Sequence, residues 1–420
     1  MWEQIESNQN KSIALIFFMA VFLLGLGYIL AEAIEPKSGI YGLTGAFIVW
    51  VIMTLTSFWG GDSILLSVSG AKKINPQDHQ MLYNVVEEMT IASGLAKVPD
   101  IYIIDDEAPN AFATGRNPDK AAVAITSGLL KMLSRDELQG VMAHELSHVN
   151  NRDTLYMTIA GIMMGAIVLI ADAGARTLFR TGGGRSRSSG RGGGQAQLVI
   201  FLVAIILMII APIVARIFYY TVSRKREYLA DACASQYTRY PEGLANALAK
   251  IGGAGMKMKK TSEATAPMYI VNPLKAPELA FDGGNFWGGL FSTHPPLGAR
   301  IKVLKSMVGA DYKAYDKAFS TVTGSSSGVI GASSLTDAQD VAIRETAEPD
   351  SPPEAIQAHV ENVRTTTDVL WKMNNYIFIS CECGTKLKIP PAYLNKVISC
   401  PHCMQDHTVV PSQQDATVAA

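Results

Sequence analysis

Two histidines and a glutamate in the run HELSH, residues 144–148, are the side chains of this sequence best suited to metal chemistry. On a helix, residues four apart lie on one face, so His144 and His148 can bind one metal ion. Imidazole nitrogens are good ligands for Zn²⁺, and Glu145, beside them, can take a proton from water at the metal. Because such a motif also arises by chance in helices, the elements around it have to support the interpretation.

The residues around the motif predict the helix that it needs. Ser134, followed three residues later by Glu137, has the pattern of a capping box, which begins a helix. Apolar residues then recur at helical spacing, namely Leu138, Val141, Met142 and Val149. We therefore expect the HELSH run to lie on a helix with one apolar stripe.

Acidic residues downstream can complete the site. Glu227 and Asp231 are four apart in a predicted helix and so share a face. We expect Glu227 to be the third metal ligand and Asp231 to orient a ligand histidine, which leaves a fourth metal position for water. The alternative for Glu227 is a solvated residue in a basic helix.

Two further segments are candidates for contact with a bound reactant. His294 precedes two prolines that restrict its backbone, so it could stabilise an oxyanion beside the metal or be purely structural. Strands are predicted at residues 101–105 and 121–126. The segment between them is a candidate edge strand that pairs with an extended backbone, and its alternative is a buried hairpin. Its residues are Asn110, Ala111, Phe112 and Ala113.

Composition places part of this 420-residue chain in lipid, since only 17% of its residues are charged and its mean hydropathy is +0.17. The net charge of −1 gives no reason to expect nucleic acid as a partner.

Four apolar runs stand out, at residues 12–34, 40–59, 154–175 and 198–220. We expect two transmembrane helices within residues 12–60, although the first run could instead be a signal peptide. Residues 61–320 are then an α+β catalytic domain that the other two runs interrupt.

The chemistry restricts the topology, because the histidines and Glu227 must lie on one side of the membrane. An even number of crossings must therefore separate them, so runs three and four either both span or both stay on one side. Three basic residues at 224–226 favour the cytoplasm for that side, while arginines between residues 176 and 194 oppose it. We expect a multi-pass protein of a bacterial-type inner (plasma) membrane, with its active site facing the cytoplasm.

The C-terminal part changes character twice. Residues 321–355 are rich in Ser, Gly, Pro and acidic side chains, which predicts a flexible linker. Two close cysteine pairs within residues 376–407 then predict a small zinc-ribbon-like module with a structural Zn²⁺. The alternatives are two disulfides, or His402 in place of one thiolate. The four candidate ligands are Cys381, Cys383, Cys400 and Cys403.

Together these motifs resemble the HtpX-type membrane zinc metallopeptidases, relatives of the CAAX prenyl proteases. The resemblance covers roughly residues 12–305 and does not include the cysteine tail. It implies an α-helical membrane protein with a mainly α zincin domain, and a zinc-dependent endopeptidase that acts on membrane or misfolded proteins in quality control. The motifs that carry it are residues 110–115, HELSH with the following NRD at 151–153, SRKREYLAD at 223–231 and THPPL at 293–297.

Two other functions remain open from the sequence. A non-catalytic membrane adaptor would use the cysteine module to bind a partner, but a purely structural metal site has no need of Glu145 as a base. A CAAX-type protease would cleave prenylated tails, and the resemblance to that family implies more membrane spans than the four apolar runs found here.

Overall fold

A computed structural model of the protein describes residues 2–182, 194–260, 266–274, 294–326, 328–331, 334–335, 340–346 and 351–410. Most of the arginine-rich loop after the third apolar run lies outside these residues, as do Thr293 and parts of the expected linker. The chain divides into two compact units. The first comprises Met1–Lys73 and Met81–Glu348, and the second comprises Ile74–Gln80 and Pro349–Ala420.

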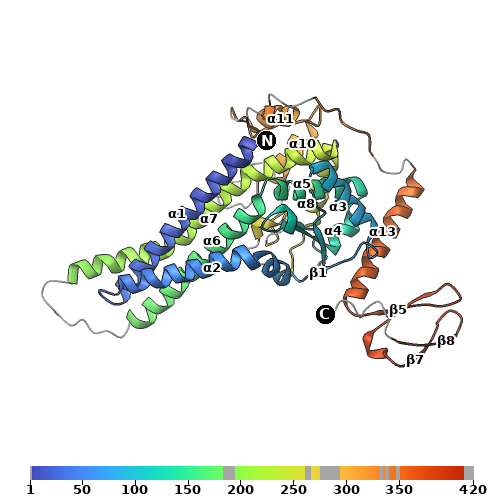
Figure 1. The fold of residues 1–420 in the computed structure, drawn as a ribbon, viewed down its shortest axis with the longest axis horizontal. Helices are drawn as coiled ribbons and strands as arrows, with labels where there is room; N and C mark the ends of the chain where they lie inside the picture. The colour runs from blue at the N-terminus through green and yellow to red at the C-terminus, as the bar shows by residue number, and fades with distance from the viewer. Residues whose placement is uncertain are drawn as a thin grey trace. The chain divides into compact units, whose positions relative to one another are not determined.

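Long apolar helices pack side by side in the first unit (Figure 1). They are α1 (Trp2–Ile34), α2 (Gly39–Val68), α6 (Asp153–Gly182) and α7 (Gly194–Thr238). Within the described residues, three segments are long and apolar enough to cross a membrane: Ile16–Ile34, Gly39–Thr56 and Met157–Thr177. The apolar part of α7, Val199–Ala215, is shorter. All four predicted apolar runs are therefore helical, and the fourth continues without a break into the helix that carries Glu227.

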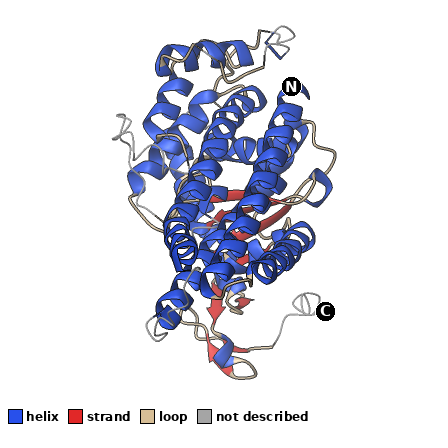
Figure 2. Ribbon diagram, turned by 90° about the vertical axis from the view of Figure 1, so that its left-hand side faces the viewer, coloured by secondary structure: helices blue, strands red, loops and turns tan. Residues whose placement is uncertain are grey.

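A four-stranded sheet lies beside these helices (Figure 2). Its order is β1-β2-β4-β3, with β2 and β4 parallel and the two outer strands antiparallel to their neighbours. The predicted strands at 101–105 and 121–126 correspond to β2 and β4, and β3 is an edge strand. The bounds are β1 Ala71–Lys73, β2 Asp100–Ile104, β3 Ala111–Thr114 and β4 Ala122–Thr126.

The helix that carries the HELSH run is α5, Arg135–Asn150, and it begins as predicted. Ser134 accepts a hydrogen bond from the backbone of Glu137, whose side chain accepts one from the backbone N–H of Ser134. Gly140 of α5 lets α8 (Pro241–Ala254) approach closely, since a Cβ at this position would lie 2.6 Å from the backbone nitrogen of Leu244. The described part of this unit also contains the helices α3 Gln80–Ser93, α4 Ser127–Met132, α10 Leu297–Lys305 and α11 Tyr312–Thr323, with single turns η1 Pro118–Lys120 and η2 Ala266–Met268.

Part of the expected linker, residues 340–346, is tied to the catalytic helices. The Arg344 guanidinium donates hydrogen bonds to Asp136 at the start of α5 (2.7 Å) and to the carbonyl of Thr238 at the end of α7 (2.8 Å). Asp136 is also paired with Thr346 (2.6 Å). The arginine of this stretch therefore bridges two helices of the first unit.

The second unit contains helix α13 (Pro352–Met373) and two small hairpins. Strands β5 and β6 form one hairpin, and β7 and β8 form the other. Their shared core contains the buried Cys381 and Cys400 with three aliphatic side chains. The bounds are β5 Ile377–Ser380, β6 Lys386–Ile389, η3 Pro391–Tyr393, β7 Val397–Ser399 and β8 Asp406–Thr408.

Candidate active site

Helices α5 and α7 bring together the three predicted metal ligands. One ligand atom from each of His144, His148 and Glu227 lies within 4.8 Å of the other two. The Nε2 atoms of the two histidines each lie 3.5 Å from an oxygen of Glu227. Because the histidines are one turn apart on α5 and the carboxylate comes from a second helix, the three groups approach one point from two sides.

A carboxylate behind each histidine sets the direction in which its ring presents a lone pair. Asp231 lies 3.0 Å from Nδ1 of His144, where it can orient that ring. Asp153, the first residue of α6, lies 3.3 Å from Nδ1 of His148, and this contact was not predicted. With a proton held on each Nδ1, the Nε2 atoms are left as ligands. In the sequence, Asp153 belongs to the NRD segment that carries the family resemblance, but no role was predicted for it.

Arg300 of α10 is the most important site residue that sequence reasoning missed. Its side chain is completely buried and donates two hydrogen bonds to Asp231, at 2.8 and 2.7 Å. It also lies 3.3 Å from an oxygen of Glu227. A buried guanidinium offsets the cost of burying two carboxylates. Its position six residues after His294 could not indicate this role, because the partners lie about 70 residues earlier.

The residues present fit a divalent metal of the zinc type. Among the described residues, Nε2 of His144 and one oxygen of Glu227 are buried without a hydrogen-bond partner. Buried polar atoms are normally satisfied, so these two lone pairs point to a cation between them. Two imidazoles and one carboxylate are the ligand set of catalytic zinc sites that keep one position open.

The charges of the site are strongly perturbed. Burial raises the pKa of Glu145, against the opposing effect of the two histidines. Burial would also raise the pKa of Glu227, but the nearby His294, His144 and His148 hold it well below its usual range. Burial lowers the pKa of His148, yet Asp153 and Glu227 together raise it to about 10. Without a metal ion, a protonated His148 and an ionised Glu227 therefore favour an ion pair. A divalent cation would take the place of the histidine proton in this pair.

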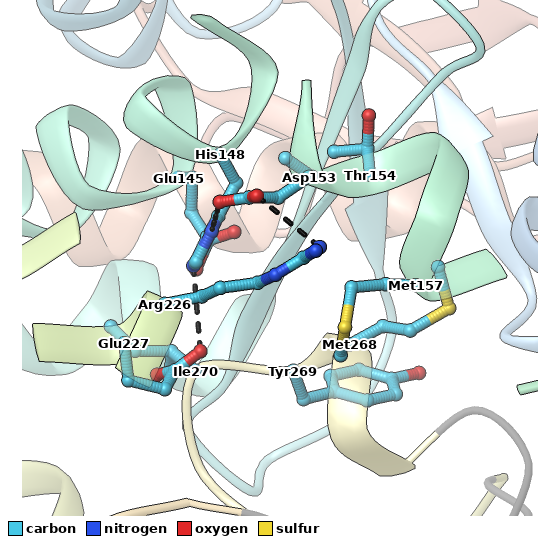
Figure 3. A pocket seen from close by; sticks show the side chains of 11 residues that line it. Glu145, His148, Asp153, Thr154, Met157, Arg226, Glu227, Met268, Tyr269 and Ile270 are labelled. Carbon is cyan, nitrogen blue, oxygen red and sulfur yellow. Dashed lines mark hydrogen bonds and ion pairs between the residues drawn. The ribbon is translucent and has the colours of Figure 1, made fainter. Parts of the chain in front are cut away.

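A cavity of about 30 Å³ opens beside these groups. Figure 3 shows Glu145 and His148 on one side of it and Met157, Met268 and Tyr269 on another. This volume is sufficient for water, which needs roughly 10 to 15 Å³ per molecule. The space next to the candidate base can therefore hold the attacking water.

Arg226, one residue before Glu227, lies in the wall of the same cavity. It is buried and pairs with Asp153 at 3.2 Å (Figure 3). It is one of the three basic residues at 224–226 whose charge favours the cytoplasmic side. Because its charge is neutralised inside the protein, only Arg224 and Lys225 remain for that argument.

His294 and the edge strand both lie at the site. Nδ1 of His294 is 3.2 Å from a Glu227 oxygen, so this residue contacts the ligand carboxylate directly. Asn110, Ala111, Phe112 and Ala113 are all buried, although β3 is at the edge of its sheet. The segment thus combines the two alternatives left open by the sequence, because an edge strand has been covered by another part of the chain.

The cysteines of the second unit form a separate cluster. The sulfurs of Cys381 and Cys403 are 3.3 Å apart and those of Cys383 and Cys400 are 3.8 Å apart. All four are free, and these distances exceed the roughly 2.05 Å of a disulfide. Four thiolates at about 2.3 Å from one ion would be separated by similar distances. The cluster fits a zinc-ribbon-like tail.

Comparison with known proteins places this site in a family. The model of peptidase family M48 matches residues 76–308. A Protease HtpX homolog from Dictyoglomus thermophilum is 38% identical over 316 residues, which are 75% of this chain and 97% of that protein. A Protease HtpX homolog from Desulfatibacillum aliphaticivorans is 44% identical over 296 residues, 70% of this chain and 88% of that protein. The crystal structure of S. mikatae Ste24p aligns with a TM-score of 0.42 at 17% identity and covers 72% of this chain and 67% of that one. Since the family model spans more than half of the chain and the HtpX homologues align over nearly their whole length, the chain belongs to peptidase family M48 and is a metalloprotease of the HtpX type.

Proposed function

We propose that this metalloprotease is a zinc-dependent endopeptidase, embedded in the membrane, that hydrolyses membrane or misfolded proteins in quality control. The observation that carries the proposal is the convergence of His144, His148 and Glu227 beside Glu145, at a cavity that can hold water. A purely structural metal site would need neither the open position nor the buried carboxylate next to it.

The residues divide the chemistry among them. Zn²⁺ held by His144, His148 and Glu227 would supply a Lewis acid that polarises the scissile carbonyl and acidifies water. Glu145 accepts a proton from the attacking water and delivers it to the leaving nitrogen, and its raised pKa makes it a stronger base. His294 is our candidate for stabilising the oxyanion, because it adjoins Glu227.

The long helices support the membrane part of the proposal. Large apolar side chains are exposed on the surface of these helices. In a membrane, lipid would cover them. Helices α6 and α7 both extend from the site and pack against each other and against α1. A crossing pair would return Glu227 to the side of the histidines, which we propose is the cytoplasm. Examples of the exposed side chains are Phe17, Tyr41, Trp59, Leu169 and Ile209.

The cysteine module is proposed to bind a second, structural Zn²⁺. Its hairpins are short and its core is small, so a metal ion would contribute much of its folding free energy. In this proposal the full chain binds two zinc ions, of which one is catalytic.

The decisive experiment compares wild type with Glu145→Gln, purified in detergent and reloaded with zinc. Unfolded β-casein serves as substrate, and zinc content is measured in parallel. We expect both proteins to bind zinc and cleavage by Glu145→Gln to fall by about 10² to 10⁴, the usual contribution of a general base. Glu107→Gln, an exposed carboxylate paired with Lys131, is the matched control and should cleave normally. Equal cleavage by wild type and Glu145→Gln would refute the proposed mechanism.

A further inference from the structure

The outer edge of β3 is occupied by the chain itself. Residues 266–274, here named the covering segment, contact it through one antiparallel bridge, with Tyr269 opposite Phe112. The backbone N–H of Ile270 donates to the carbonyl of Ala111 at 2.9 Å. The two aromatic rings meet edge to face, with centroids 4.9 Å apart. The covering segment therefore makes the contacts that a bound extended peptide would make with an edge strand.

Side chains of the site hold the covering segment in this place. The side-chain amide of Asn110 donates to the carbonyl of Val271 at 2.8 Å, and its oxygen accepts from the N–H of the same residue at 3.4 Å. Arg300 donates to the carbonyl of Ile270 at 3.3 Å. The guanidinium that supports the metal ligands is thus also bonded to the covering segment.

The covering segment limits access to the candidate base. Met268, Tyr269 and Ile270 line the cavity that contains Glu145, and the space left is about 30 Å³. Ala113, further along β3, lines the same cavity as Glu145. The strand therefore adjoins both the covering segment and the candidate base. A substrate backbone cannot pair with β3 at Ala111 while Ile270 is bonded there.

We propose that the covering segment is an autoinhibitory strand, which occupies the substrate groove and must be displaced by an extended polypeptide before hydrolysis. The inference rests on the proposed endopeptidase function and names the regulation of that site. The segment is suited to exchange because it pairs through a single bridge rather than a full strand. An incoming unfolded polypeptide would replace one antiparallel hydrogen bond with another and could extend the pairing further along β3. A folded protein offers no free extended backbone, so this arrangement selects unfolded segments.

The first test compares Ile270→Pro with Ile270→Ala in the zinc-loaded full chain. Both variants remove the side chain, but only proline removes the N–H that bonds to Ala111. We expect the kcat/KM for unfolded β-casein to be about five-fold higher in Ile270→Pro than in Ile270→Ala, since one buried hydrogen bond contributes about 1 kcal/mol. A value equal to or below that of Ile270→Ala, at equal zinc content, would show that the segment is a fixed wall and overturn the inference.

A second measurement does not depend on a variant of the covering segment. Amide hydrogen exchange is followed across residues 266–274 of zinc-loaded Glu145→Gln, with and without unfolded β-casein. Displacement predicts faster exchange in this segment when casein is present, and unchanged or slower exchange contradicts it. If wild type cleaves casein without this change, the inference fails while the endopeptidase function stands. If the exchange increases but wild type cleaves nothing, the proposed function fails and the displaceable segment remains.

Discussion

Asp231→Asn tests most directly how the site supports its metal. This side chain is completely buried, lies 3.0 Å from Nδ1 of His144 and accepts two hydrogen bonds from Arg300. Asparagine keeps the shape but loses the charge, so the ring of His144 is held less firmly and the guanidinium of Arg300 loses its closest ion partner. Both effects act on a group that touches the metal ligands.

The expected magnitude follows from these contacts. Loss of the carboxylate behind a ligand histidine typically weakens metal affinity or activity by about 10 to 100-fold. Leaving a buried guanidinium without its partner costs about 3 to 5 kcal/mol of stability, of which the nearby Glu227 oxygen at 3.3 Å can recover a part. We therefore expect Asp231→Asn to lie near the upper end of the 10 to 100-fold range. Its zinc binding should be about 100-fold weaker, which corresponds to about 2.7 kcal/mol of binding free energy.

The assay is competition between the protein and a chelating zinc indicator, with kcat/KM measured separately at saturating zinc. Asp153→Asn is the internal comparison, because its contact with His148 is longer, at 3.3 Å, and His148 is partly exposed. It should weaken zinc binding less than Asp231→Asn does. Asp100→Asn, in an exposed pair with Lys73, should change nothing. An Asp231→Asn protein that binds zinc within about three-fold of wild type would refute the reasoning.

Three further predictions concern the rest of the chain. Cys400→Ser should lower the zinc content from two ions to one per chain while casein cleavage continues, and an unchanged zinc content would contradict the structural site. Burial lowers the pKa of His79, which contacts Thr366 of α13, to about 4 from 6.5. As the pH falls, His79 therefore takes up a proton in the unfolded chain before it does so in the folded one. The second unit should lose up to about 3 kcal/mol of stability between pH 6.5 and pH 4. Amide exchange in α13 measures this loss, which should vanish in His79→Asn. If the active site faces the cytoplasm, Lys37→Cys between α1 and α2 should react with a membrane-impermeant maleimide in intact cells, and reaction only after permeabilisation would reverse the topology.

Sequence reasoning predicted the parts of the site that depend on local periodicity. The spacing within HELSH places two imidazoles on one helical face whatever surrounds the helix, and the capping box at Ser134 begins that helix in the structure. The same reasoning brought Glu227 and Asp231 onto one face of a second helix. Their approach to the histidines was expected from chemistry, since a zinc site needs a third ligand.

The rest of the site depends on residues that are distant in the chain. No role could be predicted for Asp153 or Arg300, because their contacts form only when α6 and α10 pack beside the metal helix. The same is true of Tyr269 against Phe112 and of Arg344 against Asp136. Helical and strand periodicity act over a few residues, so the sequence by itself determines which side chains share a face of an element. Which faces meet depends on the burial of apolar surface and the pairing of buried charges across the whole domain, and only the tertiary structure decides that.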